Sequence, residues 1–194
     1  NIIEGGQTMN PSTQDILEAI ERTPADTVFV FPNNKNIIMA AQQTADLCDK
    51  QVVVVPSKTV PQGISALLVF DPDASAEENL DAMTEALGNV DTMQITYAAR
   101  DSEFDGHDIR AGEYLALYGS ALFGSSPNLE ELLAALAARL REQGSEFITV
   151  YYGADTTAEQ AETAAELFRS ACPDAEVNLI DGGQPVYYYL ISAE

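Results

Sequence analysis

Two short runs of apolar, mostly β-branched residues constrain the fold of this chain more than any other feature. They cover residues 28–31 and 52–55, and such runs are typical of strands buried on both faces of a sheet. A polar loop over 32–36 and an apolar helical pattern over 37–48 separate them. Strand, helix and strand within about thirty residues predict a βαβ unit, whose two parallel strands are joined by a right-handed crossover.

The second half of the chain repeats this order. A strand is predicted over 147–151, a helix over 156–171 and another strand over 177–180, with a last strand over 186–191. Between the two βαβ units, a hairpin is predicted around Gly119.

These patterns place the chain in the α/β class. We expect two βαβ-containing lobes with mainly parallel sheets, an N-terminal lobe over residues 1–89 and a C-terminal lobe over 90–194. No linker rich in Gly, Ser or Pro separates the lobes.

Capping residues predict where two helices begin. Ser12 followed three residues later by Asp15 indicates one helix start, for which Asn10 before Pro11 is an alternative. Ser75 is predicted to cap a second helix, whose inward-facing residues are Leu80, Met83 and Leu87.

The charge balance excludes some classes of partner. The 194 residues include 9 Lys+Arg against 31 Asp+Glu, which gives a net charge of −22. Such a chain repels phosphate backbones and anionic lipids, so we expect no nucleic-acid binding. No apolar run approaches the roughly 20 residues that span a bilayer, so we expect no membrane insertion. The acidity favours a basic partner, solubility or adaptation to high salt, and the sequence leaves these three open.

Few residues are suited to metal or covalent chemistry. Cys48 and Cys172 lie far apart in apolar helical contexts, so we expect reduced thiols and a cytoplasmic protein. His107 is the single histidine, which leaves no partner for a metal site or a Ser/His/Asp triad. Phosphate-binding and dinucleotide-binding glycine motifs are absent from the sequence. We therefore predict no catalytic residue, no metal and no cofactor here. The chain opens at Asn1 without Met, and we expect it to be part of a longer protein.

Polar side chains gather in the two loops that follow the first two strands. Ligands bind at the carboxyl ends of parallel strands, and two of the three lysines, Lys35 and Lys58, fall in these loops. Lysines and amides together suit carboxylate or phosphate oxygens, although the loops could equally be helix caps and turns. The opening segment can reach the same edge. The predicted ligand- or partner-binding residues are Gln7, Thr8, Asn10, Asn33, Asn34, Lys35, Asn36, Ser57, Lys58, Thr59, Gln62, Gly63 and Gln184.

Four segments, taken in order, resemble a known family. They are residues 5–13 (Gly-Gly-Gln-Thr-Met-Asn-Pro-Ser-Thr), 32–36 (Pro-Asn-Asn-Lys-Asn), 55–63 (Val-Pro-Ser-Lys-Thr-Val-Pro-Gln-Gly) and 182–185 (Gly-Gly-Gln-Pro). They are similar to the C-terminal region of the catalytic subunit of bacterial fatty acid kinase, which is also described as dihydroxyacetone kinase-like. The resemblance implies a fold like that of DegV proteins and of the substrate-binding subunit of dihydroxyacetone kinase.

The same resemblance implies a function. The chain would be an accessory domain of a fatty acid kinase-like protein, which recognises a DegV-like fatty-acid carrier or the acyl carboxylate or phosphate that the carrier presents. ATP and Mg²⁺ are then expected in a domain N-terminal to these residues, the isolated fragment is expected to be inactive, and the other domains of the parent chain are further partners.

Two alternatives remain open. One is the substrate-binding domain of a dihydroxyacetone kinase-like small-molecule kinase or phosphatase, and the other is an interdomain scaffold. In dihydroxyacetone kinases a histidine holds the substrate covalently. His107 lies in a predicted turn outside the four segments, which argues against that chemistry.

Overall fold

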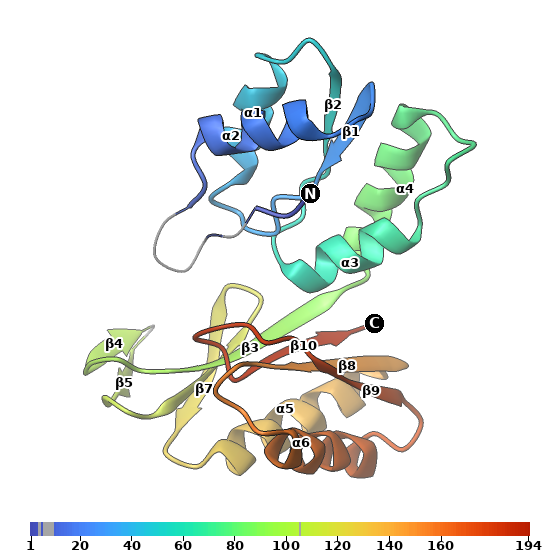
Figure 1. The fold of residues 1–194 in the computed structure, drawn as a ribbon. Coiled ribbons are helices and arrows are strands. Elements are labelled where there is room, and N and C mark those ends of the chain that lie inside the picture. Colours follow the sequence, from blue (N-terminus) through green and yellow to red (C-terminus); the bar gives the residue numbers. More distant parts are fainter. Residues whose placement is uncertain (4, 6–9, 105) are drawn as a thin grey trace. The chain divides into compact units, whose positions relative to one another are not determined.

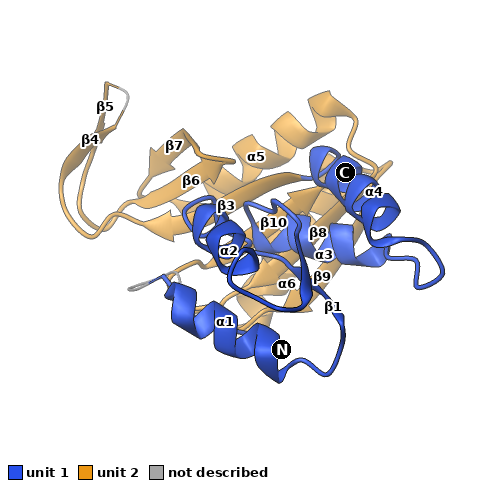
Figure 2. Ribbon diagram, turned by 90° about the horizontal axis from the view of Figure 1, so that it is seen from above, with its two compact units in different colours: residues 1–90 blue, residues 91–194 orange. Residues whose placement is uncertain are grey.

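The computed structural model describes residues 1–3, 5, 10–104 and 106–194 (Figure 1). The α/β class is confirmed, because helices and strands alternate along most of the chain. The chain forms two compact units, residues 1–90 and 91–194, which are coloured separately in Figure 2. We call them unit 1 and unit 2.

Unit 1 is a three-layer structure around a small parallel sheet. Its elements are α1 (Thr13–Arg22), β1 (Thr27–Val30), α2 (Ile38–Ala45), β2 (Gln51–Val54), α3 (Val60–Leu68) and α4 (Ala76–Gly88). β1 and β2 pair in parallel, so the first predicted βαβ unit is confirmed.

Both faces of this sheet are covered. Val28 and Val30 pack with residues of α1 and α2, whereas Phe29 and Phe31 pack with residues of α3 and α4. The alternation arises because successive side chains of a strand point to opposite faces. A strand covered on both sides has to be apolar throughout, which explains the uninterrupted run in the sequence.

Unit 2 is a larger sheet with two helices on one face (Figure 1). Its strands lie in the order β7-β6-β3-β10-β8-β9, and β4 and β5 form a separate hairpin. Its elements are β3 (Asp91–Tyr97), β4 (Ser102–Phe104), β5 (His107–Ile109), β6 (Tyr114–Tyr118), β7 (Ala121–Ser126), α5 (Leu129–Gln143), β8 (Phe147–Tyr152), α6 (Ala158–Ala171), β9 (Glu176–Asp181) and β10 (Tyr189–Ala193).

The expectation of mainly parallel sheets is wrong for unit 2. β8 and β9 are parallel, as the second βαβ unit predicted, but β10 pairs antiparallel with both β8 and β3. β3, β6 and β7 are also joined antiparallel. An apolar run indicates a buried strand and carries no direction, and the short turn at Gly119 permits only an antiparallel return.

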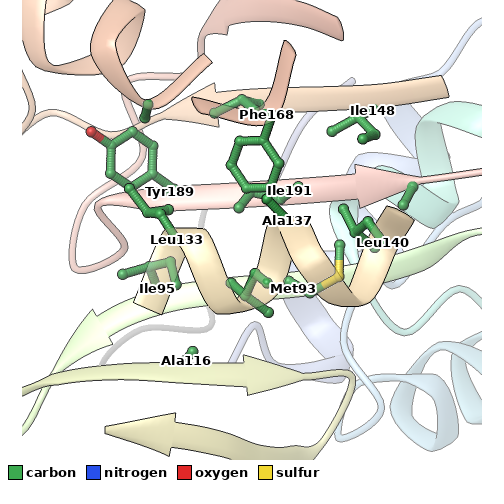
Figure 3. Close-up of a cluster of buried hydrophobic side chains, with 14 of the residues drawn as sticks. Met93, Ile95, Ala116, Leu133, Ala137, Leu140, Ile148, Phe168, Tyr189 and Ile191 are labelled. Atoms are coloured by element: carbon green, nitrogen blue, oxygen red, sulfur yellow. The ribbon is translucent and has the colours of Figure 1, made fainter. Parts of the chain in front are cut away.

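The core of unit 2 lies between the sheet and its two helices. Leu133, Ala137 and Leu140 of α5 and Phe168 of α6 pack against Ile191 and its neighbours on the central strands (Figure 3). Phe168 and Ile191 are completely buried. These helices present their leucine and alanine stripe to the sheet, which is the packing that their helical periodicity predicts.

The ends of several elements differ from the predictions. Of the two proposed caps for α1, Ser12 is the one used, in a capping box with Asp15. The last strand begins at Tyr189 and not at residue 186, because Val186 adopts a left-handed conformation (φ 71°) that interrupts the extended chain.

Candidate functional site

The two polar loops of unit 1 begin at the same edge of its sheet. Val30 and Val54 are register partners at the ends of β1 and β2, and the N–H of Val55 donates to the carbonyl of Val30 (2.9 Å). Because the strands are parallel, both chains leave the sheet in the same direction. Residues 32–36 and 56–59 therefore start side by side.

Asn33 and Ser57 join these loops through two hydrogen bonds. The backbone N–H of Asn33 donates to Oγ of Ser57 (3.0 Å), and Oγ of Ser57 donates to Oδ1 of Asn33 (2.8 Å). Ser57 is completely buried. Asn33 has a φ of 53°, a left-handed conformation that Asn tolerates better than most residues. The pair fixes the two loops to each other, since a buried hydroxyl or amide without its partner is costly.

Gly63, in the second turn of α3, completes this junction. A Cβ atom on Gly63 would collide with Oδ1 of Asn33 and would lie 2.9 Å from its Cγ. The absence of a side chain at Gly63 therefore lets Asn33 lie directly against α3. Asn33, Ser57 and Gly63, all predicted site residues, form one packed cluster, which we call the loop junction.

The amide of Gln62 connects the loop to α4. Its Oε1 accepts from the backbone N–H of Lys58 (2.9 Å), and its Nε2 donates to the carbonyl of Leu87 (3.1 Å). The backbone N–H of Gln62 donates to the side chain of Thr59, which is the N-cap of α3. These internal bonds use both ends of the Gln62 side chain, so Gln62 positions the loop.

Three predicted site residues present their side chains to solvent. Lys35, Asn36 and Lys58 are exposed, and no hydrogen bond or ion pair of these side chains occurs among the described residues. Asn34 supports the first loop, because its Oδ1 accepts from the backbone N–H of Asn36 (2.9 Å). The arrangement is a rigid base that carries two cations and an amide.

The third lysine has a different environment. Nζ of Lys50 donates to the carbonyls of Ile20 (3.1 Å), Glu21 (3.1 Å) and Thr23 (2.5 Å), which terminate α1. A cation at this end of a helix interacts favourably with its dipole. Lys50 therefore stabilises the helix end, whereas Lys35 and Lys58 have no such role in the described residues.

The remaining predicted residues are not joined to the loop junction. Gln7 and Thr8 lie outside the described residues. Asn10 is exposed ahead of α1 and makes no hydrogen bond within the described chain. Gln184 belongs to unit 2, where its Nε2 donates to the carbonyls of Tyr151 (3.0 Å) and Tyr187 (3.4 Å).

Sequence reasoning missed how the loop junction is built. The signals were present, because a glycine early in a helix and an asparagine directly after a strand both indicate unusual backbone or close packing. Neither signal identifies Asn33 as the group that Gly63 accommodates.

Two further observations concern the described residues alone. Within residues 1–3, 5, 10–104 and 106–194, no three His, Cys, Asp or Glu side chains are grouped so that they could hold a metal ion. Over the same ranges, no helix has the length and apolar character needed to cross a membrane.

Comparison of the whole fold shows a clear likeness to DegV proteins. The DegV family protein Cg2579 from Corynebacterium glutamicum superposes with a TM-score of 0.70 at 18% identity, over 100% of this chain and 86% of that protein. The Fak B3 protein of Streptococcus pneumoniae, solved with linoleic acid, gives 0.67 at 14% identity over 95% of this chain and 76% of that protein. Dihydroxyacetone kinase from C. freundii gives 0.64 at 13% identity over 94% and 41%. The predicted DegV-like and dihydroxyacetone kinase-like fold is confirmed.

Sequence comparison identifies the family. Protein YloV of Bacillus subtilis (strain 168) is 44% identical over 193 residues, which cover all of this chain and 35% of YloV. The chain thus spans about a third of the length of the curated relatives that it matches. Residues 1–194 match the FakA-like C-terminal family, in which FakA denotes a fatty acid kinase subunit. The chain therefore belongs to the FakA-like C-terminal family of fatty acid kinases.

Proposed function

We propose that this chain is the accessory domain of a fatty acid kinase and recognises a DegV-like fatty-acid carrier, or the acyl carboxylate or phosphate that the carrier presents. Family membership supports the link to the kinase, and the structural neighbour Fak B3 was solved with linoleic acid. The observation that carries the recognition role is the loop junction, which holds exposed Lys35, Asn36 and Lys58 on a rigid base.

The chemistry of these three side chains suits an anion. A lysine supplies a point charge with three donors, and an amide supplies an oriented donor. The rest of the chain is strongly acidic, with a net charge of −22. Two lysines on one rigid edge therefore form a local cationic site in a negative background, which favours a carboxylate or phosphate there over other parts of the surface.

Substitution of exposed loop residues tests this function. In the intact protein that carries these residues, Lys58→Ala and Asn36→Ala are expected to lower fatty acid phosphorylation about tenfold to a hundredfold, because one charge-assisted bond contributes about 1.5–3 kcal/mol. Both side chains are exposed, so the melting temperature should hardly change. Lys50→Ala is the matched control and should do the reverse, lowering the melting temperature with little effect on activity.

Each outcome of that experiment distinguishes the proposals. Full activity in both loop variants would mean that the loops are caps and turns, and the scaffold alternative would then hold. Early melting in both would show that the residues are structural. A dihydroxyacetone kinase-like substrate domain has less support, because exposed His107 makes no side-chain hydrogen bond among the described residues.

The nucleotide and metal belong elsewhere in this proposal. The described residues offer no cluster of carboxylates for Mg²⁺, so they do not fit the ATP–Mg²⁺ complex that a kinase uses. We place ATP and Mg²⁺ in the part of the parent protein outside these residues, and we derive no step through them. Calorimetric ATP binding by a fragment limited to these residues would contradict this assignment.

A further inference from the structure

Helix α3 has an unusual distribution of side chains between its two faces. Its buried residues are Pro61, Gly63 and Ala66, all of them small, and Ala66 packs with Met83 and Leu87 of α4. Its large apolar residues point the other way. A helix that packs only within its own domain shows the opposite pattern, because burial of large apolar side chains is the main stabilising contribution.

The exposed residues form one continuous stripe. Residues Val60, Ile64, Leu67 and Leu68 follow the helical spacing of i, i+4, i+7 and i+8, and Val69 and Phe70 continue the stripe beyond the helix. Leu67 is 57% exposed and Leu68 80% exposed. We call these six residues the α3 stripe. Contiguous exposed apolar surface of this kind is typical of a binding surface.

The base of the stripe is held in place. The ring of Phe70 packs edge-to-face on Phe29 of β1, with ring centroids 5.7 Å apart. Beyond it, Nδ2 of buried Asn79 donates to the carbonyl of Asp71 (2.8 Å), and the N–H of Asp71 donates to Oδ1 of Asn79 (2.9 Å). The stripe is therefore presented by an ordered turn, so little conformational entropy would be lost when a partner covers it.

Charge identifies the kind of partner. Residues 59–90 contain no Lys, Arg or His, and their charged residues are Asp71, Asp73, Glu77, Glu78, Asp81 and Glu85. These carboxylates follow the stripe directly and lie on α4, which packs beside α3. An apolar centre with a wholly acidic rim is complementary to an apolar surface ringed by Lys and Arg.

The same charges disfavour the other occupants. A second copy of this chain would bring two acidic rims together, and residues 91–194 are themselves far richer in carboxylates than in arginines. An anionic membrane would be repelled for the same reason. The occupant that fits is a separate, basic-rimmed protein.

We propose that the α3 stripe is the docking surface for the DegV-like carrier, and that the carrier meets it with an apolar patch ringed by basic residues. This inference rests on the function proposed above. The stripe begins directly after Lys58 and Thr59, so a partner seated on it also covers the loop that carries the proposed anion site. Docking and headgroup recognition would then share one continuous surface of unit 1.

The experiment measures binding of the intact protein to its cognate DegV-family protein, loaded with linoleic acid, by surface plasmon resonance. Leu67→Ser/Leu68→Ser is expected to raise the Kd by at least about tenfold, because each leucine loses a buried apolar contact. Leu47→Ser is the matched control, since Leu47 is 66% exposed in unit 1 but lies outside the stripe, and its Kd should equal that of the wild type.

A second pair of variants tests the rim. Asp71→Lys/Asp73→Lys is expected to slow association several-fold and to reduce the dependence of the association rate on salt, because steering by opposite charges is screened by ions. Asp46→Lys/Asp49→Lys makes the same charge change elsewhere in unit 1 and should have a smaller effect.

The outcomes separate this inference from the proposed function. Absence of binding by the wild type would overturn the proposed function. Wild-type binding that Leu67→Ser/Leu68→Ser leaves unchanged would overturn the α3 stripe alone. If the double variant melts early, Leu68→Ser replaces it, because Leu68 is the most exposed leucine of the stripe and contributes least to folding. A wild-type dimer that the serine variants dissociate, with carrier binding intact, would make a second copy the occupant and overturn the proposal.

Discussion

The two units use the same βαβ connection in different surroundings. In unit 1, β1-α2-β2 forms the whole sheet, helices cover both of its faces, and the apolar core divides into two small clusters. In unit 2, β8-α6-β9 is one edge of a six-stranded sheet with a single large cluster on one face. The comparison indicates that unit 2 owes its stability to one core, whereas unit 1 depends on precise contacts among loops and helix ends.

The largest expected effect tests the single core of unit 2. Phe168→Ala removes a completely buried ring and should reduce the free energy of unfolding of unit 2 by about 3–5 kcal/mol. Hydrogen exchange should show the loss in the amides of β3, β8 and β10, with little change in unit 1. The matched control is Phe147→Ala on β8, which is 52% exposed and should cost no more than about 1 kcal/mol. An equal loss of protection in both units would mean that they unfold together and would end the comparison.

Alkaline pH should act on unit 2 selectively, because all 8 tyrosines lie in residues 91–194. Burial raises the pKa of Tyr189 to about 12, while an unfolded tyrosine titrates near pH 10. The folded state therefore holds its proton longer, and this contribution is complete below pH about 10 and lost as pH rises through the folded pKa.

The expected loss from Tyr189 is about 2 kcal/mol between pH 10 and 12, measured by urea unfolding. Tyr189→Phe should remove this part of the slope. Tyr97→Phe, at an exposed tyrosine of β3, should leave the slope as it is in the wild type. A slope that is the same in all three proteins would show that Tyr189 is not the group responsible.

The loop junction of unit 1 can be tested with a pair of glycines. Gly63→Ala should reduce the free energy of unfolding by about 1–3 kcal/mol, because the new methyl group meets Asn33. Gly88→Ala, at the end of α4, has nothing within 4 Å of its Cβ and should be neutral or slightly stabilising.

A second substitution confirms the cause of that effect. Asn33→Gly removes the opposing side chain and suits the positive φ, so Gly63→Ala should cost clearly less in the Asn33→Gly background. Equal costs in the two backgrounds would show that Asn33 is not what constrains Gly63. Thermal unfolding of the four proteins gives the coupling energy.

The smallest expected effect concerns the helix caps, which the two units share. Ser75 caps α4 with Glu78 as its partner, and Thr157 caps α6 with Gln160. Ser75→Ala and Thr157→Ala should each cost about 1 kcal/mol at neutral pH, despite the difference in core.

The two caps should differ in acid. Hydrogen bonds from Ser75 lower the pKa of Glu78, so its contribution is present above the unfolded pKa and is lost as pH falls through the folded pKa. Gln160 does not titrate. Melts recorded at neutral and at acidic pH should therefore show a shrinking effect of Ser75→Ala and a constant effect of Thr157→Ala, and the reverse pattern would refute this assignment.

Local sequence patterns determined most secondary-structure elements of this protein. The runs over 28–31 and 52–55 indicated two buried strands, and the structure has them as β1 and β2. Ser12 and Ser75 indicated helix starts that both act as capping boxes. These features are predictable because a cap or an alternating pattern depends only on residues a few positions apart.

Contacts between distant segments decided the rest. The direction of β10 follows from its insertion between β3 and β8, and no feature of residues 189–193 encodes it. Asn33 meets Gly63 across thirty positions of sequence, which makes a structural junction of residues that the sequence offered only as candidate ligands. The apolar pattern of α3 showed a helix, but α4 determined which of its faces is covered and left Leu67 and Leu68 exposed. Burial is a property of packed neighbours, so the sequence alone determines which segments are apolar, and only the tertiary structure determines which of them remain open to a partner.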